Sequence, residues 1–234
     1  MTRKIKMIIV SALCTLVIVV IGILIMPYIK KINSNVIWQD NKVSGNEQIL
    51  LNFIDNNLTN KDGSIKTNYK DVDSDGDITK GKAVLSESEG MLLLYYLDRN
   101  DKEKFDNVLS YIKEKMILEN GLVSWRVTEE KREGTSATID DLRIIKALLL
   151  ASERWNKISY RNTAFKISKG IKKELLDNNV LVDYNDGKSK ANTTTICYLD
   201  IETLSLLAHF FYVNKIMVFR EYIIENNEKM YQNK

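Results

Sequence analysis

The sequence predicts an all-α domain that follows one N-terminal transmembrane helix. Residues 7–26 form an uncharged run of 20 positions rich in Ile, Val and Leu. Farther along, apolar residues recur three and four positions apart, which is typical of amphipathic helices, whereas the alternating pattern of strands is nearly absent. Short polar links alternate with long glycine-containing loops. This rhythm indicates stacked helical hairpins whose long loops share one face.

The apolar run is long enough to cross a membrane, because a helix that rises about 1.5 Å per residue then spans the roughly 30 Å hydrocarbon layer. Arg3, Lys4 and Lys6 precede it and favour a cytoplasmic N-terminus, with the rest of the chain outside the cell. A cleaved signal peptide is the alternative, but its apolar core is usually shorter and ends at a small-x-small site. We therefore expect a cytoplasmic head over 1–6 and a signal anchor over 7–29, in a single-pass protein of a bacterial cell membrane with its domain outside.

The remaining chain has the composition of a polar stalk followed by one domain. Residues 30–46 are polar and lack helical periodicity, so we expect a stalk there. Residues 47–234 suffice for one domain with a substantial core but are few for two. The formal net charge is +3 and basic residues are mixed with acidic ones, which excludes nucleic acid as a partner. Cys197 is the only cysteine after the anchor, so no internal disulfide is expected.

Apolar residues at helical spacing predict about seven helices in the domain. The predicted helices cover residues 48–58, 86–97, 105–116, 142–155, 164–175, 201–211 and 216–224. Long loops rich in turn-favouring residues lie over 59–83, over 119–136 and around Gly187. The link over 98–102 is short, and short links place consecutive helices antiparallel to each other.

The first candidate for chemistry lies where the second predicted helix begins, at Ser86-Glu87-Ser88-Glu89-Gly90. Ser86 and Glu89 have the spacing of a capping box, in which both side chains accept hydrogen bonds from backbone N–H groups at the helix start. Glu87 has no such local role and could face a ligand at the loop-rich end. The alternative is a solvated glutamate that stabilises the helix dipole.

A second acidic helix start repeats this pattern. Thr138 and Asp141 have capping-box spacing, which leaves Asp140 the freer acid, although first-turn acids are more often electrostatic caps. Trp125, in a loop flanked by glycines, could stack on a sugar ring or anchor the loop in the core. Two carboxylate-rich helix starts at one end of a domain are the minimum equipment for acid/base catalysis on a glycosidic bond.

We expect no metal or cofactor. Residues 71–78 match the first half of a calcium loop, but the twelfth position is Lys82, where a bidentate acid is required. An acidic turn is therefore the simpler interpretation of this segment. His209 is the only histidine and lies in an apolar helical segment, so no spacing of ligands supports a zinc site.

Taken in order, these motifs resemble glycoside hydrolase family 8, whose members cleave β-1,4-linked glucans, xylans and chitosans with inversion. The resemblance covers residues 53–211, and Asp62-Gly63 and Tyr198 fall in the expected order. The segments that resemble the family's Ser-Glu-Gly-x-x-Tyr-Gly-Met, Leu-x-x-Trp-Arg and Ala-Thr-Asp-Ala-Asp-Leu motifs are 84–90, 121–126 and 136–142.

The resemblance implies an (α/α)6 toroid with its cleft at the loop-rich face and a polysaccharide as substrate. Glu87 matches the family's general acid. A polysaccharide synthase machinery is a further possible partner. The residues expected to bind the substrate are Asp140, Asp141, Trp125, Arg126 and Tyr198.

Three departures from the family pattern bear on these expectations. Ile139 stands where the family has the first aspartate of its Ala-Thr-Asp motif, so that role would pass to Asp140 or be lost. Met91 and Leu92 replace an aromatic-glycine pair. The Tyr-Asp-Ala-x-Arg segment with the water-activating base is not found before Lys234, and about seven helices fall short of twelve, so we expect an incomplete, C-terminally truncated toroid.

Two interpretations therefore remain open at the level of the sequence. The first is a membrane-anchored extracellular glycosidase that hydrolyses a β-1,4-linked polysaccharide or exopolysaccharide. The second is an inactive relative that binds polysaccharide or associates with a synthase. A reading frame interrupted before the base would also explain the missing segment.

Overall fold

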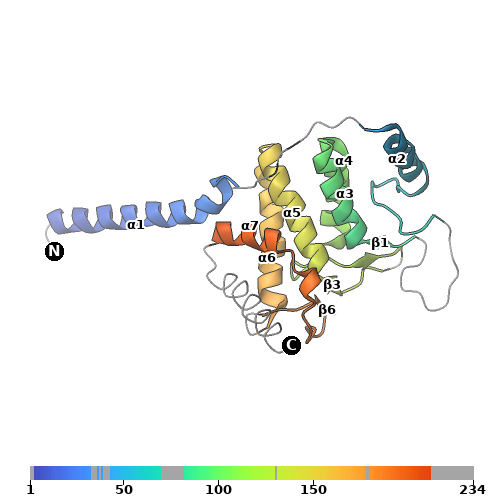
Figure 1. Cartoon of the computed structure of the whole chain (residues 1–234). Coiled ribbons are helices and arrows are strands. Elements are labelled where there is room, and N and C mark those ends of the chain that lie inside the picture. Colours follow the sequence, from blue (N-terminus) through green and yellow to red (C-terminus); the bar gives the residue numbers. More distant parts are fainter. Residues whose placement is uncertain are drawn as a thin grey trace, which may run out of the picture.

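The computed structural model describes residues 3–32, 36, 38, 43–69, 82–129, 131–177 and 180–211. This part of the chain is mostly helical, as predicted, and one long helix projects from a helical domain (Figure 1). The helices are α1 (Arg3–Ile29), α2 (Gly45–Asn57), α3 (Ser86–Asp98), α4 (Lys102–Tyr111), α5 (Thr138–Arg154), α6 (Ile158–Glu174) and α7 (Ile201–Phe211), with a π-helix η1 (Ile112–Met116) and a 3₁₀-helix η2 (Ile196–Tyr198).

Helix α1 is long and apolar enough to cross a membrane, and none of its most apolar window is buried in the protein. The six predicted helices that fall on described residues are confirmed, with the last turns before residue 117 forming the π-helix η1. The seventh, over 216–224, lies outside the described residues, as do the segment 71–78 and the side chain of His209.

The core forms around α5, which packs against α3 on one side and α6 on the other. Leu142, Ile145 and Leu148 of α5 are completely buried, as helical spacing of apolar residues requires for a central helix. α3 and α4 form one antiparallel hairpin, and α5 and α6 form the next. The tight turns contain Asn100 and Asn156 at positive φ, a conformation that asparagine tolerates better than most residues.

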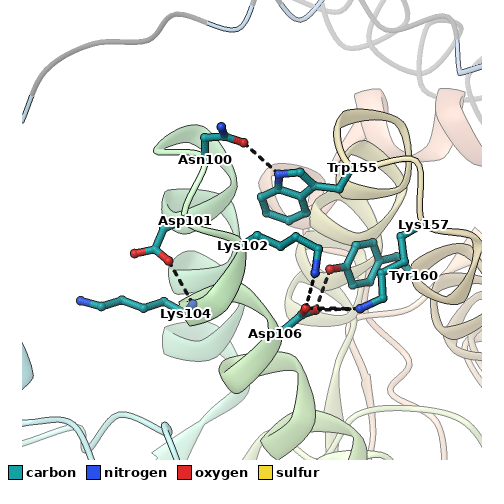
Figure 2. A network of polar contacts seen from close by, with 8 residues as sticks. All are labelled: Asn100, Asp101, Lys102, Lys104, Asp106, Trp155, Lys157 and Tyr160. Carbon is teal, nitrogen blue, oxygen red and sulfur yellow. Dashed lines mark hydrogen bonds and ion pairs between the residues drawn. The ribbon is translucent and has the colours of Figure 1, made fainter.

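A polar network joins the two hairpins at their turns (Figure 2). The indole of Trp155 donates a hydrogen bond to the Asn100 side chain at 2.8 Å. The carboxylate of Asp106 accepts from the hydroxyl of Tyr160 at 2.6 Å and from the ammonium of Lys157 at 3.2 Å. The network ties α4 to α6 across α5 at one end of the domain, which leaves the other end for the long loops.

Short antiparallel strand pairs organise that loop-rich end. β1 pairs with β2 beside the start of α3, and β3 pairs with β6 beside the start of α5. Each strand has only two residues, too few to show the alternation by which strands are predicted, which is why the sequence indicated almost none. The strands are β1 (Val84–Leu85), β2 (Arg126–Val127), β3 (Ser136–Ala137), β4 (Leu176–Asp177), β5 (Val180–Leu181) and β6 (Tyr184–Asn185).

Two described residues of the predicted stalk over 30–46, Ile32 and Trp38, contact the domain. Ile32 is buried, and its backbone N–H donates to the Glu153 carboxylate at 2.9 Å. The ring of Trp38 lies under the Arg154 guanidinium, 4.3 Å from it. Farther along, Ser44 forms a complete capping box with Glu47, so α2 begins within the predicted stalk.

Candidate functional site

The three motif segments predicted to meet do meet at the loop-rich end. The hydroxyl of Ser86, at the start of α3, donates to the Asp140 carboxylate of α5 at 2.7 Å. The backbone N–H of Ser86 donates to the carbonyl of Trp125 at 3.0 Å. Residues 54 positions apart in the chain thus share one hydrogen bond, and the loop with Trp125 closes over the same helix start.

The capping box predicted at Ser86 and Glu89 is wrong. The residue at the cap position is Leu85, which has no side-chain capping bond, because Ser86 already lies in the helix and uses its hydroxyl on Asp140. The Glu89 carboxylate accepts instead from the backbone N–H of Ile65 at 2.8 Å. Tertiary partners have replaced the local ones.

The second predicted box is wrong for the same reason. Ala137 occupies the cap position of α5, and the Thr138 hydroxyl donates to the carbonyl of Val182 at 2.6 Å. Asp141 accepts from the backbone N–H of Val123 at 3.0 Å. Both side chains therefore attach loops to the start of α5 rather than capping it.

Glu87 and Asp140 lie close enough for their charges to repel each other. Glu87 is exposed at the first turn of α3, while Asp140 is 7% exposed. The Arg143 guanidinium donates to the Asp140 carboxylate at 2.9 Å. Burial raises the pKa of Asp140, the Ser86 hydrogen bond and the Arg143 charge oppose this, and the nearby Glu87 charge adds to the rise.

Glu89 differs sharply from Glu87, although both lie in the same turn. Its side chain is completely buried, and burial raises its pKa to about 8 despite the hydrogen bond from Ile65, with the Asp62 charge adding to the rise. The carboxyl is therefore neutral at pH 7 and supports the loop around Asp62. Of the two glutamates, only Glu87 has surface available to a ligand.

Asp141 is likewise completely buried. Burial raises its pKa well above the ordinary value, while the Val123 N–H opposes the shift. Among the described residues its second carboxyl oxygen has no hydrogen-bond partner. Its contact with Val123 positions the loop that carries Trp125, and no surface of Asp141 is open to a sugar in this structure.

Trp125 is half-buried, and the guanidinium of Arg126 lies 5.4 Å from its ring centre. Arg126 also pairs with Glu133 at 3.1 Å, which anchors this cation beside the indole. Tyr198 is exposed in η2 and contacts none of Glu87, Asp140 and Trp125 among the interactions found in the described part of the chain.

Sequence reasoning missed two residues near the site, Arg143 and Asp183, and gave Ser86 a different role. Arg143 follows Asp140 by three positions on the same helix face, a spacing from which their pairing could have been predicted. Ser86 was assigned a local role that it does not have. The Asp183 carboxylate accepts from the backbone N–H of Thr195 at 2.6 Å, and no sequence signal pointed to it. Within the described ranges, no group of three His, Cys, Asp or Glu side chains could hold a metal ion.

Comparison with known proteins shows the family to which this chain belongs. The sequence profile of the glycosyl hydrolases family 8 matches residues 53–191. YdaJ of Bacillus subtilis (strain 168), which carries the name of a lipoprotein, is 30% identical over 155 residues that cover 66% of this chain and 40% of YdaJ.

Several solved structures are similar to this chain in sequence and fold. A structure described as a novel alpha-amylase from Clostridium perfringens is 47% identical, with a TM-score of 0.70 over 76% of this chain and 52% of that one. PssZ from Listeria monocytogenes is 30% identical, with a TM-score of 0.57 over 71% of this chain and 50% of that one.

The endo-beta-1,4-glucanase CMCax from Acetobacter xylinum shares the fold at 18% identity, with a TM-score of 0.58 over 71% of this chain and 52% of that one. The predicted relation to an (α/α)6 toroid is thereby confirmed. The chain spans about half the length of these structures and 40% of the curated relative.

Proposed function

The chain belongs to glycosyl hydrolase family 8. We propose that it functions as a membrane-anchored glycosidase, which hydrolyses an extracellular polysaccharide by an inverting acid/base mechanism. The observation that carries the proposal is the exposed Glu87 carboxyl beside Asp140 at the loop-rich end. Glycosidases of this kind place two carboxyl groups on either side of the scissile bond, one of which protonates the leaving oxygen.

In this proposal Glu87 is the general acid. Asp140, held from two sides by Ser86 and Arg143, presents a fixed acceptor for a sugar hydroxyl. Trp125 offers its apolar indole to a sugar ring, and the Arg126 guanidinium beside it adds a donor for ring hydroxyls. Tyr198 and Asp141 remain predictions as binding residues, and the burial of Asp141 favours a positioning role for it.

The linkage of the substrate is a separate proposal. The resemblance to the family favours a β-1,4-linked glucan, chitosan or exopolysaccharide. The 47% identical structure, however, is described as an alpha-amylase, so α-linked glucans are the competing substrate class. Parallel assays on cellulose-derived, chitosan and starch-derived oligosaccharides decide between these two linkages.

The test is the substitution Glu87→Gln, assayed by the release of reducing ends. Loss of a general acid lowers turnover by roughly 100-fold or more. Glu103→Gln is the matched control, because Glu103 is also an exposed first-turn glutamate but begins α4. If Glu87→Gln retains full turnover while the parent is active, the assignment of the acid is wrong.

Binding without hydrolysis is the second candidate function. It is motivated by Ile139, which stands where the family has the first aspartate of its Ala-Thr-Asp motif. Calorimetric titration with the same oligosaccharides, run beside the reducing-end assay, separates the two functions. Saturable binding with no release of reducing ends would support the binding protein and contradict the enzyme.

We also propose that α1 anchors the domain in the membrane with its loop-rich end outside the cell. The support is the length and apolar character of α1 and the basic residues before it. Protease added to intact cells should digest the domain and spare an N-terminal fragment. Full protection of the domain in intact cells would contradict this orientation.

A further inference from the structure

The end of the membrane helix is bound firmly to the domain. The guanidinium of Arg161 in α6 is 5% exposed and donates to the carbonyls of Tyr28 at 2.8 Å and Lys30 at 2.7 Å. These carbonyls lie at the C-terminal end of α1, where helical acceptors lack partners of their own. Arg161, a residue of the domain, therefore supplies hydrogen-bond donors to the carbonyls at the end of α1.

Two further contacts complete this junction. Glu153 pairs with Arg161 and accepts the backbone N–H of Ile32, so one carboxylate holds both the guanidinium and the chain that leaves α1. The ring of Tyr28 meets that of Phe165 edge to face, with ring centres 5.2 Å apart. The junction fixes the direction of α1 relative to α6.

This fixed direction decides which surface faces a bilayer. In Figure 1, α1 points away from the domain and runs transverse to α6. When α1 spans a membrane, Tyr28 lies at the interface with water, a depth that tyrosine prefers. The side of α6 next to Tyr28 then lies at the level of the lipid headgroups.

A cavity of about 330 Å³ lies on that side of the domain. It begins at Tyr28 and Phe165 and is lined along α6 by Lys166, Lys169 and Lys173. The three lysines are three and four positions apart, so they share one helix face. All three are exposed.

The charge at this cavity is mainly positive. Lys173 pairs with its neighbour Glu174, whereas Lys166 and Lys169 have no ion-pair partner in the part of the chain that the structure describes. Glu119 is the acidic residue at the cavity and is itself exposed. The cavity therefore has an excess of cations over carboxylates, which suits an anionic ligand.

The backbone provides a rigid wall for the cavity. Gly121 and Gly170 let the loop at 119–121 approach α6 so closely that a Cβ on Gly170 would lie 2.8 Å from the Gly121 carbonyl carbon. Gly121 has a φ of +91°, which glycine adopts without strain. The lysines therefore line one side of a preformed hollow.

We propose that this lysine-lined cavity binds the phosphate-bearing headgroups of anionic lipids in the leaflet from which α1 emerges. The inference rests on the proposed anchoring by α1 and deepens it, since the domain would then lie against the bilayer with α6 along its surface. Lysines at an anionic membrane surface gain electrostatic attraction that neutral lipids do not supply. The Tyr28 ring, which packs on Phe165, lies where the apolar helix α1 meets the lysine-lined cavity.

The test uses the full chain reconstituted in nanodiscs of phosphatidylcholine alone or with one-third phosphatidylglycerol. Acetylation of each lysine is followed by mass spectrometry. We expect Lys166, Lys169 and Lys173 to react roughly fivefold more slowly in the anionic discs, and this protection to vanish in high salt. Lys113 and Lys115, exposed on η1, should react equally in both.

A second measurement counts the lipids retained by the detergent-solubilised protein in native mass spectrometry. The parent should retain phosphatidylglycerol in preference to phosphatidylcholine, and the triple variant K166Q/K169Q/K173Q should lose that preference. The variant K61Q/K113Q/K115Q removes the same charge from exposed lysines elsewhere and should keep it. Equal retention by both variants would overturn the proposal.

Two further measurements distinguish a lipid site from a simple anion site and the headgroup contact from the anchoring by α1. Inorganic phosphate added to neutral discs tests a simple anion site, and full protection of the lysines by phosphate would overturn the assignment to lipid. Insertion of α1 is read independently from its protection against protease. Inserted protein with equally reactive lysines in both discs overturns the headgroup site alone, whereas failure to insert overturns the anchoring as well.

Discussion

Glu87 and Glu89 show how two residues of the same type in one helical turn acquire different chemistry. Both are first-turn acids by sequence, but Glu87 is exposed beside Asp140 and Glu89 is sealed under the loop that carries Ile65. Burial keeps Glu89 protonated, and exposure makes Glu87 available to a substrate. The position of each relative to the rest of the fold, rather than its local sequence, determines the difference.

Glu89 makes stability depend on pH in a predictable direction. Its pKa is about 8 in the folded protein and near 4.5 when unfolded, so the folded state binds more protons between these values. Its contribution to stability is complete below about pH 4.5 and is lost as the pH rises to about 8. The slope cannot exceed about 1.4 kcal/mol per pH unit for one group.

The substitution Glu89→Gln tests this expectation. Glutamine keeps an acceptor for the Ile65 N–H but does not ionise, so the free energy of unfolding should fall less steeply between pH 5 and about 8 than in the parent. Urea denaturation at several pH values measures it. An unchanged pH profile in the variant would show that Glu89 titrates normally.

At the scale of elements, the loop with Trp125 depends on its contact with α6. Gly170 faces the backbone of Gly121 and Leu122, and the loop continues through Val123, whose N–H binds the Asp141 carboxylate. Helix α6, which packs on one side of α5, thus supports the loop that carries Trp125 to the candidate site. Small residues at this crossing allow the backbones to meet.

We predict that Gly170→Ala destabilises the domain by about 1–3 kcal/mol, as overpacking of a tight contact does. The added Cβ would lie 2.8–2.9 Å from backbone atoms that cannot rotate away. Thermal unfolding measures the effect. Gly45→Ala at the start of α2 is the control, since nothing lies within 4 Å of its Cβ and its stability should not fall.

The helices of the domain could be predicted from their apolar spacing, and the short strands could not. Leu142, Ile145 and Leu148 repeat at intervals that only a buried helix face requires. β1 and β3 have two residues each and exist because their partners arrive from more than 40 residues away. A local pattern carries no information about such pairing.

At the scale of the whole molecule, the end of α1 is joined to the domain by polar contacts. The buried Arg161 and the half-buried Glu153 form an ion pair that also binds the backbone of Tyr28, Lys30 and Ile32. Because the Arg161 side chain is buried and each partner is hydrogen-bonded, removal of either one weakens the contacts of the other. The anchor and the hairpins of α5 and α6 should therefore unfold together.

We predict that Arg161→Met lowers the free energy of unfolding of the full chain by about 3 kcal/mol. The variant removes the donor of the Tyr28 and Lys30 carbonyls and leaves Glu153 with the Ile32 N–H as a donor. Denaturation in detergent, followed by tryptophan fluorescence, measures the change. Lys172→Met, an exposed cation on the same helix, is the control, and an equal loss in both would contradict a specific junction.

The sequence by itself determined the long apolar helix, the six described helices after it and the order of the three motifs, because hydrophobic periodicity and chain order are properties of the sequence alone. Only the tertiary structure decided the partners of Ser86, Glu89, Thr138 and Asp141. For each of these side chains the sequence predicted a hydrogen-bond partner three residues away. The partner in the structure lies 18 or more residues away. A side chain that could cap its own helix binds elsewhere when folding brings a buried donor or acceptor that would otherwise remain unpaired.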